Sequence, residues 1–183
     1  MGASVQKQDR NIATVGDLAS SRKCLIFYPE QFIKIILKTM QATRTGCAAV
    51  VDDSGHLVGM LTEREILRRI FTLIADPTIN HANIGKYIDD MTVRDVMIAS
   101  PHSLADDTDI EQALEVMTDL GFRFMPVVSR SDPAKAMGLV DEREVAIHVK
   151  NRLDQVKREA TEKEYLLNGL FREPYGAGCE NYF

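Results

Sequence analysis

Two short segments of this 183-residue chain place a side-chain oxygen, an arginine and a glutamate at the expected start of a helix. The first reads Thr62-Glu63-Arg64-Glu65, and the second reads Asp141-Glu142-Arg143-Glu144. The N-terminus of a helix offers unpaired amide groups and the positive end of the helix dipole, so it favours anions such as phosphate. Arginine guanidinium groups, including that of Arg123, add forked hydrogen bonds to the same kind of ligand. These residue types therefore indicate two possible sites for an anionic ligand.

The same residues also have a purely structural interpretation. Thr62 and Asp141 are both good N-cap residues, and Glu65 follows Thr62 at the spacing of a capping box. Glutamates in the first turn, such as Glu65 and Glu144, stabilise a helix through its dipole without any ligand. Arginines are common on protein surfaces. Taken alone, these residues leave both interpretations open.

The two segments belong to an internal duplication. Residues 59–65, Gly-Met-Leu-Thr-Glu-Arg-Glu, recur as residues 138–144, Gly-Leu-Val-Asp-Glu-Arg-Glu. The opening residues correspond as well, with Thr14 to Leu18 matching Thr92 to Val96. A unit of about 55 to 60 residues is near the lower limit for folding alone, so the two copies are expected to share one core.

Hydrophobic periodicity predicts the same elements in each copy. We expect a strand at 24–28, a helix at 30–42 that ends near Gly46, and a hairpin of strands 48–51 and 56–61 followed by a helix over 63–74. The second copy should have a strand near 102–104, a helix at 109–120, a hairpin and a helix from 142. The expected division is a flexible N-terminus (1–13), a first motif (14–75), a linker (76–91), a second motif (92–150), and a C-terminal helix and tail (151–183).

The last helix carries one apolar stripe. Val149, Leu153, Val156 and Ala160 share a face, and pairs of opposite charge at i, i+4 spacing occupy the other side. The stripe either packs on its own domain or contacts a second copy of the chain, and the sequence favours neither.

Composition narrows the possible functions. The chain is 45% apolar with a formal net charge of −5, which is globular and argues against nonspecific binding of nucleic acid. We find no apolar run of membrane-spanning length and no signal-peptide pattern, which predicts a cytoplasmic protein. Three cysteines and four histidines are scattered without metal-ligand spacing. With no nucleophile–base pair and no glycine-rich phosphate loop, an enzyme is not expected.

The order of these motifs resembles the cystathionine-β-synthase-type (CBS) domain pair, also called a Bateman module. The second copy matches closely: Asp95-Val96-Met97 opens it, and Gly121-Phe122-Arg123-Phe124-Met125-Pro126-Val127-Val128 leads into its first hairpin strand. The resemblance covers about residues 14–150. It leaves no room for a catalytic domain, which predicts a stand-alone pair.

The resemblance implies an α+β fold of two pseudo-symmetric β-α-β-β-α units packed through small sheets, followed here by an extended C-terminal helix. It also implies two equivalent clefts that hold AMP, ADP or ATP, or in some members S-adenosylmethionine or a dinucleotide such as NAD. No further cofactor or metal is required. The implied function is a regulatory module that senses adenine nucleotides and signals, as a homodimer, to an unidentified partner protein. The alternative is a dimerisation or interaction scaffold with vestigial clefts.

In the family, an aspartate three residues after a threonine or serine accepts the two ribose hydroxyls. Here that position holds Glu65 in one copy and Glu144 in the other, each longer than aspartate by one methylene. Asp141 places a negative charge where a hydroxyl would meet the phosphate, so the cleft of Thr62 is expected to bind more tightly. The cleft of Asp141 is expected to be degenerate, to prefer a nucleoside or to require a metal. Adenine is expected between the apolar side chains of Ile98, Phe124 and Met125, with core packing as the alternative for Met125. The full set of predicted ligand-binding residues is Thr62, Arg64, Glu65, Ile98, Arg123, Phe124, Met125, Pro126, Asp141, Arg143 and Glu144.

Overall fold

A computed structural model describes residues 13–21 and 24–170 of the chain. It divides into two compact units, Met1–Ala146 and Ile147–Phe183, which are treated separately below. The predicted flexible N-terminus up to residue 12 and the tail from residue 171 lie outside the described residues.

In chain order the elements are α1 (Val15–Ser20), β1 (Ile26–Phe27), α2 (Ile33–Thr43), β2 (Cys47–Val51), β3 (Leu57–Thr62), α3 (Glu63–Ala75), η1 (His81–Asn83), α4 (Ile84–Asp90), η2 (Val93–Asp95), β4 (Ile98–Ala99), β5 (Leu104–Ala105), α5 (Ile110–Leu120), β6 (Phe124–Val128), β7 (Ala136–Asp141) and α6 (Glu142–Leu170).

The strands form two small sheets of matching design. The first has the order β1-β2-β3-β4 and the second β5-β6-β7, and in each a short parallel strand precedes an antiparallel hairpin. The hairpins share even their irregularity, because the register shifts at Val50/Val51 in one and at Val127/Val128 in the other. The predicted α+β fold with two repeated units is confirmed, as is the long C-terminal helix.

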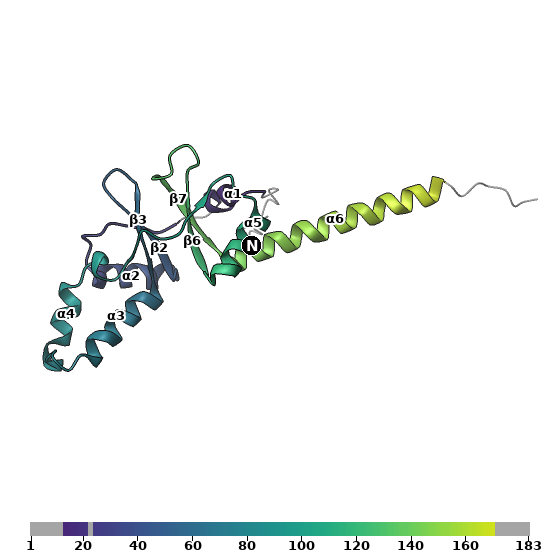
Figure 1. The fold of residues 1–183 in the computed structure, drawn as a ribbon. Helices are drawn as coiled ribbons and strands as arrows, with labels where there is room; N and C mark the ends of the chain where they lie inside the picture. The colour runs from purple at the N-terminus through teal and green to yellow at the C-terminus, as the bar shows by residue number, and fades with distance from the viewer. Residues whose placement is uncertain (1–12, 22–23, 171–183) are drawn as a thin grey trace, which may run out of the picture. The chain divides into compact units, whose positions relative to one another are not determined.

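The two hairpins lie side by side and are hydrogen-bonded to each other near their turns (Figure 1). The amide of Leu57 donates to the carbonyl of Ala134 at 2.7 Å, and that of Ala136 donates to the carbonyl of Gly55 at 3.3 Å. These backbone bonds join the two repeats into one body.

The segment that opens each repeat packs against the sheet of the other repeat. The amides of Val15 and Gly16, at the start of α1, donate to the carbonyls of Thr108 and Asp106 in the second repeat, each at 2.9 Å. In return, β4 pairs with β3, and Val93 and Val96 are buried in the core of the first repeat. The shared core predicted from the size of the repeat therefore rests on an exchange of opening segments.

The buried side chains of the first repeat come from the faces that periodicity predicts. Strand β2 is buried along its whole length between the elements that cover it. Among the described residues of both repeats, the largest fully buried side chains are Leu18, Ile33, Ile36, Met40, Leu61, Ile66, Ile110, Met117, Met125, Val15, Val50 and Val93.

Several predicted boundaries were wrong. Helix α2 runs to Thr43, so its left-handed C-cap is Arg44 (φ 53°) and not Gly46. The expected strands at 24–28 and 102–104 are two-residue strands at Ile26–Phe27 and Leu104–Ala105. The predicted linker contains helix α4, which an ion pair of 2.7 Å between Lys34 and Asp89 ties to α2. Tertiary contacts of this kind are invisible to a local pattern.

Within the part of the chain that the structure describes, no helix is long and apolar enough to cross a membrane.

Candidate functional site

A hollow with a volume of about 340 Å³ opens on one face of α3, next to the segment that starts the second repeat. We call it the α3 hollow. It combines residues from the first repeat's closing motif with residues from the second repeat's opening motif, so neither repeat could form it alone. Its lining residues are Glu65, Arg68, Arg69, Thr72, Asp95, Val96 and Met97.

Thr62 and Glu65 hold the N-terminus of α3 at the edge of this hollow. The hydroxyl of Thr62 accepts a hydrogen bond of 3.2 Å from the amide of Glu65, which is the first half of the predicted capping box. The carboxylate of Glu65 instead pairs with the guanidinium of Arg68 at 2.6 Å. The Glu65 side chain is only 15% exposed, whereas that of Arg68 is 76% exposed. A ligand that needs this carboxylate must therefore compete with Arg68, which is free to swing away.

Asp95 also lines the α3 hollow, and its side chain stabilises the segment that starts the second repeat. Its carboxylate accepts hydrogen bonds of 2.8 Å from both the amide and the hydroxyl of Thr92, which completes a capping box. The amide hydrogen bond from Thr92 lowers the pKa of Asp95 most, and the charges of Arg69 and Arg94 lower it further. The hollow thus carries two carboxylates and two guanidinium groups, and its charge is balanced before a ligand enters.

The lowered pKa of Asp95 predicts a pH dependence of stability. A carboxyl group with a depressed folded-state pKa stabilises the fold above its unfolded-state pKa, and that stabilisation is lost as the pH falls through the folded-state pKa. Asp95→Ala should therefore lower the free energy of unfolding by about 1 kcal/mol at pH 7 and by less in acid. Urea denaturation at pH 7 and pH 3 measures this, with Asp95→Asn as the uncharged control that keeps an acceptor. An Asp95→Ala deficit that is the same at both pH values would contradict the assignment.

In the second repeat, Asp141 corresponds to Thr62, and its carboxylate forms an ion pair. Asp141 accepts a hydrogen bond of 2.9 Å from the amide of Arg143, and its other carboxylate oxygen lies 3.6 Å from the guanidinium of Arg123. The same guanidinium lies over the ring of Phe124, with its central carbon 4.7 Å from the ring centroid. Arg123 therefore neutralises Asp141 and is held in place by an aromatic face.

The two repeats differ here by a matched pair of residues. Strand pairing aligns Cys47 with Thr62 in one hairpin and Phe124 with Asp141 in the other, so Gly46 occupies the place of Arg123. The first repeat combines a neutral threonine with glycine, and the second combines aspartate with arginine. The sequence alone made Asp141 look like an uncompensated negative charge, and the structure corrects this. Because Arg123 offsets its charge, Asp141 repels phosphate less than the sequence suggested. The same ion pair engages the guanidinium of Arg123, which was predicted to face a ligand.

The apolar residues predicted to contact adenine come from both sheets. Ile98 belongs to β4 and pairs with Met60 in the four-stranded sheet, whereas Phe124 is in the three-stranded sheet. Met125 is 1% exposed and Pro126 is also buried, so both side chains belong to the core. The burial of Met125 agrees with core packing, the alternative given for it, and Ile98 and Phe124 stay predicted contacts of adenine.

The remaining predicted residues lie in the first turns of α3 and α6. Arg64 and Arg143 are exposed, and Glu144 is partly buried. The structure brings Thr62, Arg64 and Glu65 together at the start of α3, and Arg123, Asp141, Arg143 and Glu144 together at the start of α6.

Sequence reasoning missed most of the residues that line the α3 hollow. Arg68, Arg69 and Thr72 follow Glu65 at i+3, i+4 and i+7, so helical spacing alone could have placed them on one face. Asp95 to Met97 were recognised only as the opening motif of the second copy, because only the exchange of opening segments brings them to α3.

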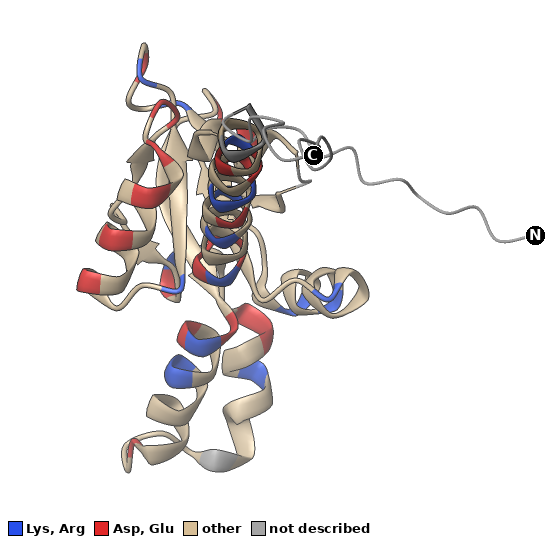
Figure 2. Ribbon diagram, turned by 90° about the vertical axis from the view of Figure 1, so that its right-hand side faces the viewer, with Lys and Arg blue, Asp and Glu red and all other residues tan. Residues whose placement is uncertain are grey.

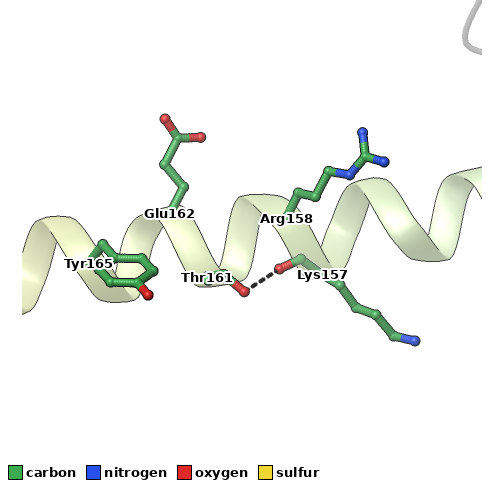
Figure 3. A pocket seen from close by; sticks show the side chains of 5 residues that line it. All are labelled: Lys157, Arg158, Thr161, Glu162 and Tyr165. Carbon is green, nitrogen blue, oxygen red and sulfur yellow. Dashed lines mark hydrogen bonds between the residues drawn. The ribbon is translucent and has the colours of Figure 1, made fainter.

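A second hollow, of about 440 Å³, lies along α6. Its lining residues, Lys157, Arg158, Thr161, Glu162 and Tyr165, all come from successive turns of one helix (Figure 3). It is a groove between exposed side chains and lacks the converging walls of a ligand site.

Cysteine and metal chemistry find no support in the described residues. Burial raises the pKa of the Cys24 thiol, which keeps that thiol protonated and unreactive. No group of three or more potential metal ligands occurs within residues 13–21 and 24–170.

Two α+β repeats that share one body define the class of a duplicated α+β module, and the hollow where they exchange segments is its candidate site. The model of the CBS domain matches residues 15–72 and 93–151. The chain therefore belongs to the CBS domain family.

Individual relatives agree with this assignment. An uncharacterized 17.7 kDa protein from the bps2 3′ region of Acidianus ambivalens is 24% identical over 74% of this chain and 73% of its own length. The meiotically up-regulated gene 70 protein of Schizosaccharomyces pombe is 28% identical over 67% of this chain, which spans only 15% of that longer protein. Among solved structures, CBSX2 in complex with AMP is 25% identical, with a TM-score of 0.60 over 79% of this chain and 98% of that one. A second structure shows CBSX2 from Arabidopsis thaliana.

Proposed function

We propose that this chain is a regulatory module that binds an adenine nucleotide, with AMP, ADP or ATP as the first candidates. The observation that carries the proposal is the α3 hollow, where the poorly exposed carboxylate of Glu65 meets Arg68, Arg69 and Thr72. A ribose presents two adjacent hydroxyls to such a carboxylate, and a phosphate group suits guanidinium and hydroxyl donors. The likeness to CBSX2, whose structure contains AMP, supports the same ligand class.

In this proposal the two repeats bind unequally. Glu65 lines a defined hollow, whereas Arg123 is engaged by Asp141 at the matching place in the second repeat. Binding then shifts the conformation of the pair through its greater affinity for one state, and a partner protein reads that state. The module works by binding and not by catalysis. A cytoplasmic location, the homodimer and the motif boundaries at 14–75 and 92–150 are further parts of the proposal.

A scaffold with vestigial clefts is the second candidate, and the pre-formed Glu65–Arg68 pair favours it. Thermal melts with AMP, ATP, NAD and S-adenosylmethionine separate the two functions. Saturation at one hundred times the dissociation constant should stabilise the fold by about 2.7 kcal/mol, which is a rise of several degrees at this size. A melt that no adenine ligand moves at millimolar concentration would eliminate the sensing function and leave the scaffold.

Arg68 should set the preference for nucleotides over nucleosides. The ribose hydroxyls must displace Arg68 from Glu65, and the displaced guanidinium is then available to the phosphate. Arg68→Ala should therefore tighten adenosine binding and weaken AMP binding, so that the AMP preference falls roughly tenfold. Isothermal titration of both ligands measures the ratio, with Phe71→Ala as the control on the same helix, because Phe71 is exposed and does not line the α3 hollow. If the ratio is unchanged in Arg68→Ala, Arg68 has no part in recognition.

A further inference from the structure

The second unit carries an apolar stripe at heptad spacing. In α6, Val149, Leu153, Val156 and Ala160 alternate at intervals of four and three residues, which is the a/d pattern of a coiled coil. Leu153 is 48% exposed, Val156 is 57% exposed, Ala160 is exposed as well, and Val149 is partly buried. With Leu153 and Ala160 at a positions, the d positions fall at Val149 and Val156. The stripe therefore has the pattern of a surface that packs against another helix.

The charges beside this stripe are mainly positive. Lys150 and Lys157, both exposed, take the e positions on one edge, and Arg152 and Glu159 take the g positions on the other. Three positive side chains and one negative side chain thus flank the stripe, in a chain whose net charge is −5. Figure 2 shows Lys and Arg among Asp and Glu along α6. A helix that complements the e edge must present carboxylates there.

A second copy of α6 does not supply this complement. A parallel pair sets Arg152 against Lys157 of the second copy, and it sets Glu159 against Glu164, so both contacts are repulsive. The antiparallel pair that stacks the stripe on itself brings Lys150 against Lys157 twice. This repulsion offsets the two attractive contacts that the same pair makes between Arg152 and Glu159. Charge therefore opposes one orientation of a second copy and gives no gain in the other.

A lysine also takes the next d position. Lys163 follows Val156 at the spacing of one heptad, and it is exposed. An ammonium group at a core position of a helix pair loses its hydration, which is costly unless a carboxylate of the partner helix faces it. With Lys150 and Lys157, it places three ammonium groups along one side of α6. Glu164, at the following e position, lies beyond the stripe.

We propose that α6 is a docking helix for a different protein, and that its occupant is an amphipathic helix with carboxylates along the edge that meets Lys150 and Lys157. The inference does not rest on the α3 hollow, because docking on this stripe needs no nucleotide. Two heptads make a short interface, so the complex should have a dissociation constant in the micromolar range.

A synthetic helix of defined composition tests this chemistry. The probe is a fluorescent peptide of three heptads with leucine at the a and d positions and glutamate at the e and g positions, whose like charges oppose its self-pairing. The full chain without nucleotide should bind it with a micromolar dissociation constant, measured by fluorescence anisotropy. The same peptide with lysine at the e and g positions should bind at least roughly tenfold more weakly.

Two adjacent residues provide matched variants. Lys157→Glu reverses a charge on the e edge, whereas Arg158→Glu makes the same change in net charge at the exposed f position beside it. Lys157→Glu should weaken binding of the acidic peptide roughly fivefold, because a repulsive contact replaces an attractive one, and it should favour the basic peptide. Arg158→Glu should leave the preference unchanged. Circular dichroism confirms that each variant keeps its helix. Equal effects of the two substitutions would overturn the proposal.

The other occupants give different results. If a second copy covers the stripe, Leu153→Asp should dissociate a dimer in sedimentation equilibrium, and the chain should not prefer the acidic peptide. If the stripe packs on its own domain, neither peptide should bind, and Leu153→Asp should lower the melting temperature. Either result would overturn the proposal. A melt that AMP shifts in a chain that binds neither peptide would eliminate the docking helix and leave the nucleotide-binding function intact.

Discussion

Gly16→Ala should lower the free energy of unfolding by about 3 kcal/mol. A Cβ atom at this position would lie 2.6 Å from the carbonyl oxygen of Asp106 and 2.9 Å from its Cβ. The backbone of Asp106 cannot move aside without breaking the hydrogen bond of 2.9 Å that it accepts from the amide of Gly16. The substitution would therefore separate α1 from the second repeat. Chemical denaturation monitored by circular dichroism measures the loss.

Gly85→Ala is the matched control. Gly85 lies in α4, and nothing would come within 4 Å of an added Cβ. Alanine has a higher helix propensity than glycine, so this variant should gain up to about 1 kcal/mol of stability. If both substitutions had the same effect, the close approach of α1 to Asp106 would not exist in solution.

Leu61→Ala should cost about 3 kcal/mol, which is a large part of the stability of an ordinary domain. Leu61 is fully buried in β3, inside the cluster that contains Ile33, Ile36 and Val93. The loss combines the removed apolar surface with the cavity that remains, since neighbours from both repeats hold its walls apart. Denaturation midpoints in urea provide the measurement.

The equivalent change in the second repeat tests the shared core. Strand pairing makes Val140 the counterpart of Leu61, and Val140 is 1% exposed. Val140→Ala removes less side chain and should cost about 2 kcal/mol. Because the repeats exchange segments, either substitution should lower one common transition of the first unit. Two separate transitions, each sensitive to one substitution only, would show that the repeats fold independently.

Local sequence patterns predicted those elements that depend only on residues close together in the chain. The apolar run at 48–51 became the fully buried β2, and Gly121 ends α5 in the left-handed conformation (φ 66°). Thr14 with Asp17, and Thr92 with Asp95, form the same capping box, as their repeated sequences suggest. These features depend on neighbours within a few residues, which the sequence displays directly.

Only part of the candidate site could be predicted from the sequence, because its other residues are distant in the chain. Thr62, Arg64 and Glu65 stand in one motif, and the repeat itself drew attention to them. Asp95 lies thirty residues from Glu65 in the chain, and nothing in the local sequence of either residue indicates that they line one hollow. The pairing of Asp141 with Arg123 was hidden in the same way, because it depends on the register of β6 and β7.

The sequence by itself determined that this protein is a duplication, because a repeated order of caps, helices and hairpins needs only local patterns to be recognised. It also determined that Thr62 of the first copy is replaced by Asp141 in the second. Only the tertiary structure decided what that difference means. It showed that each repeat lends its opening segment to the other, which builds the α3 hollow, and that Arg123 compensates Asp141. Such contacts arise from the burial of apolar surface and the pairing of charges across the fold, and these act between residues far apart in the chain.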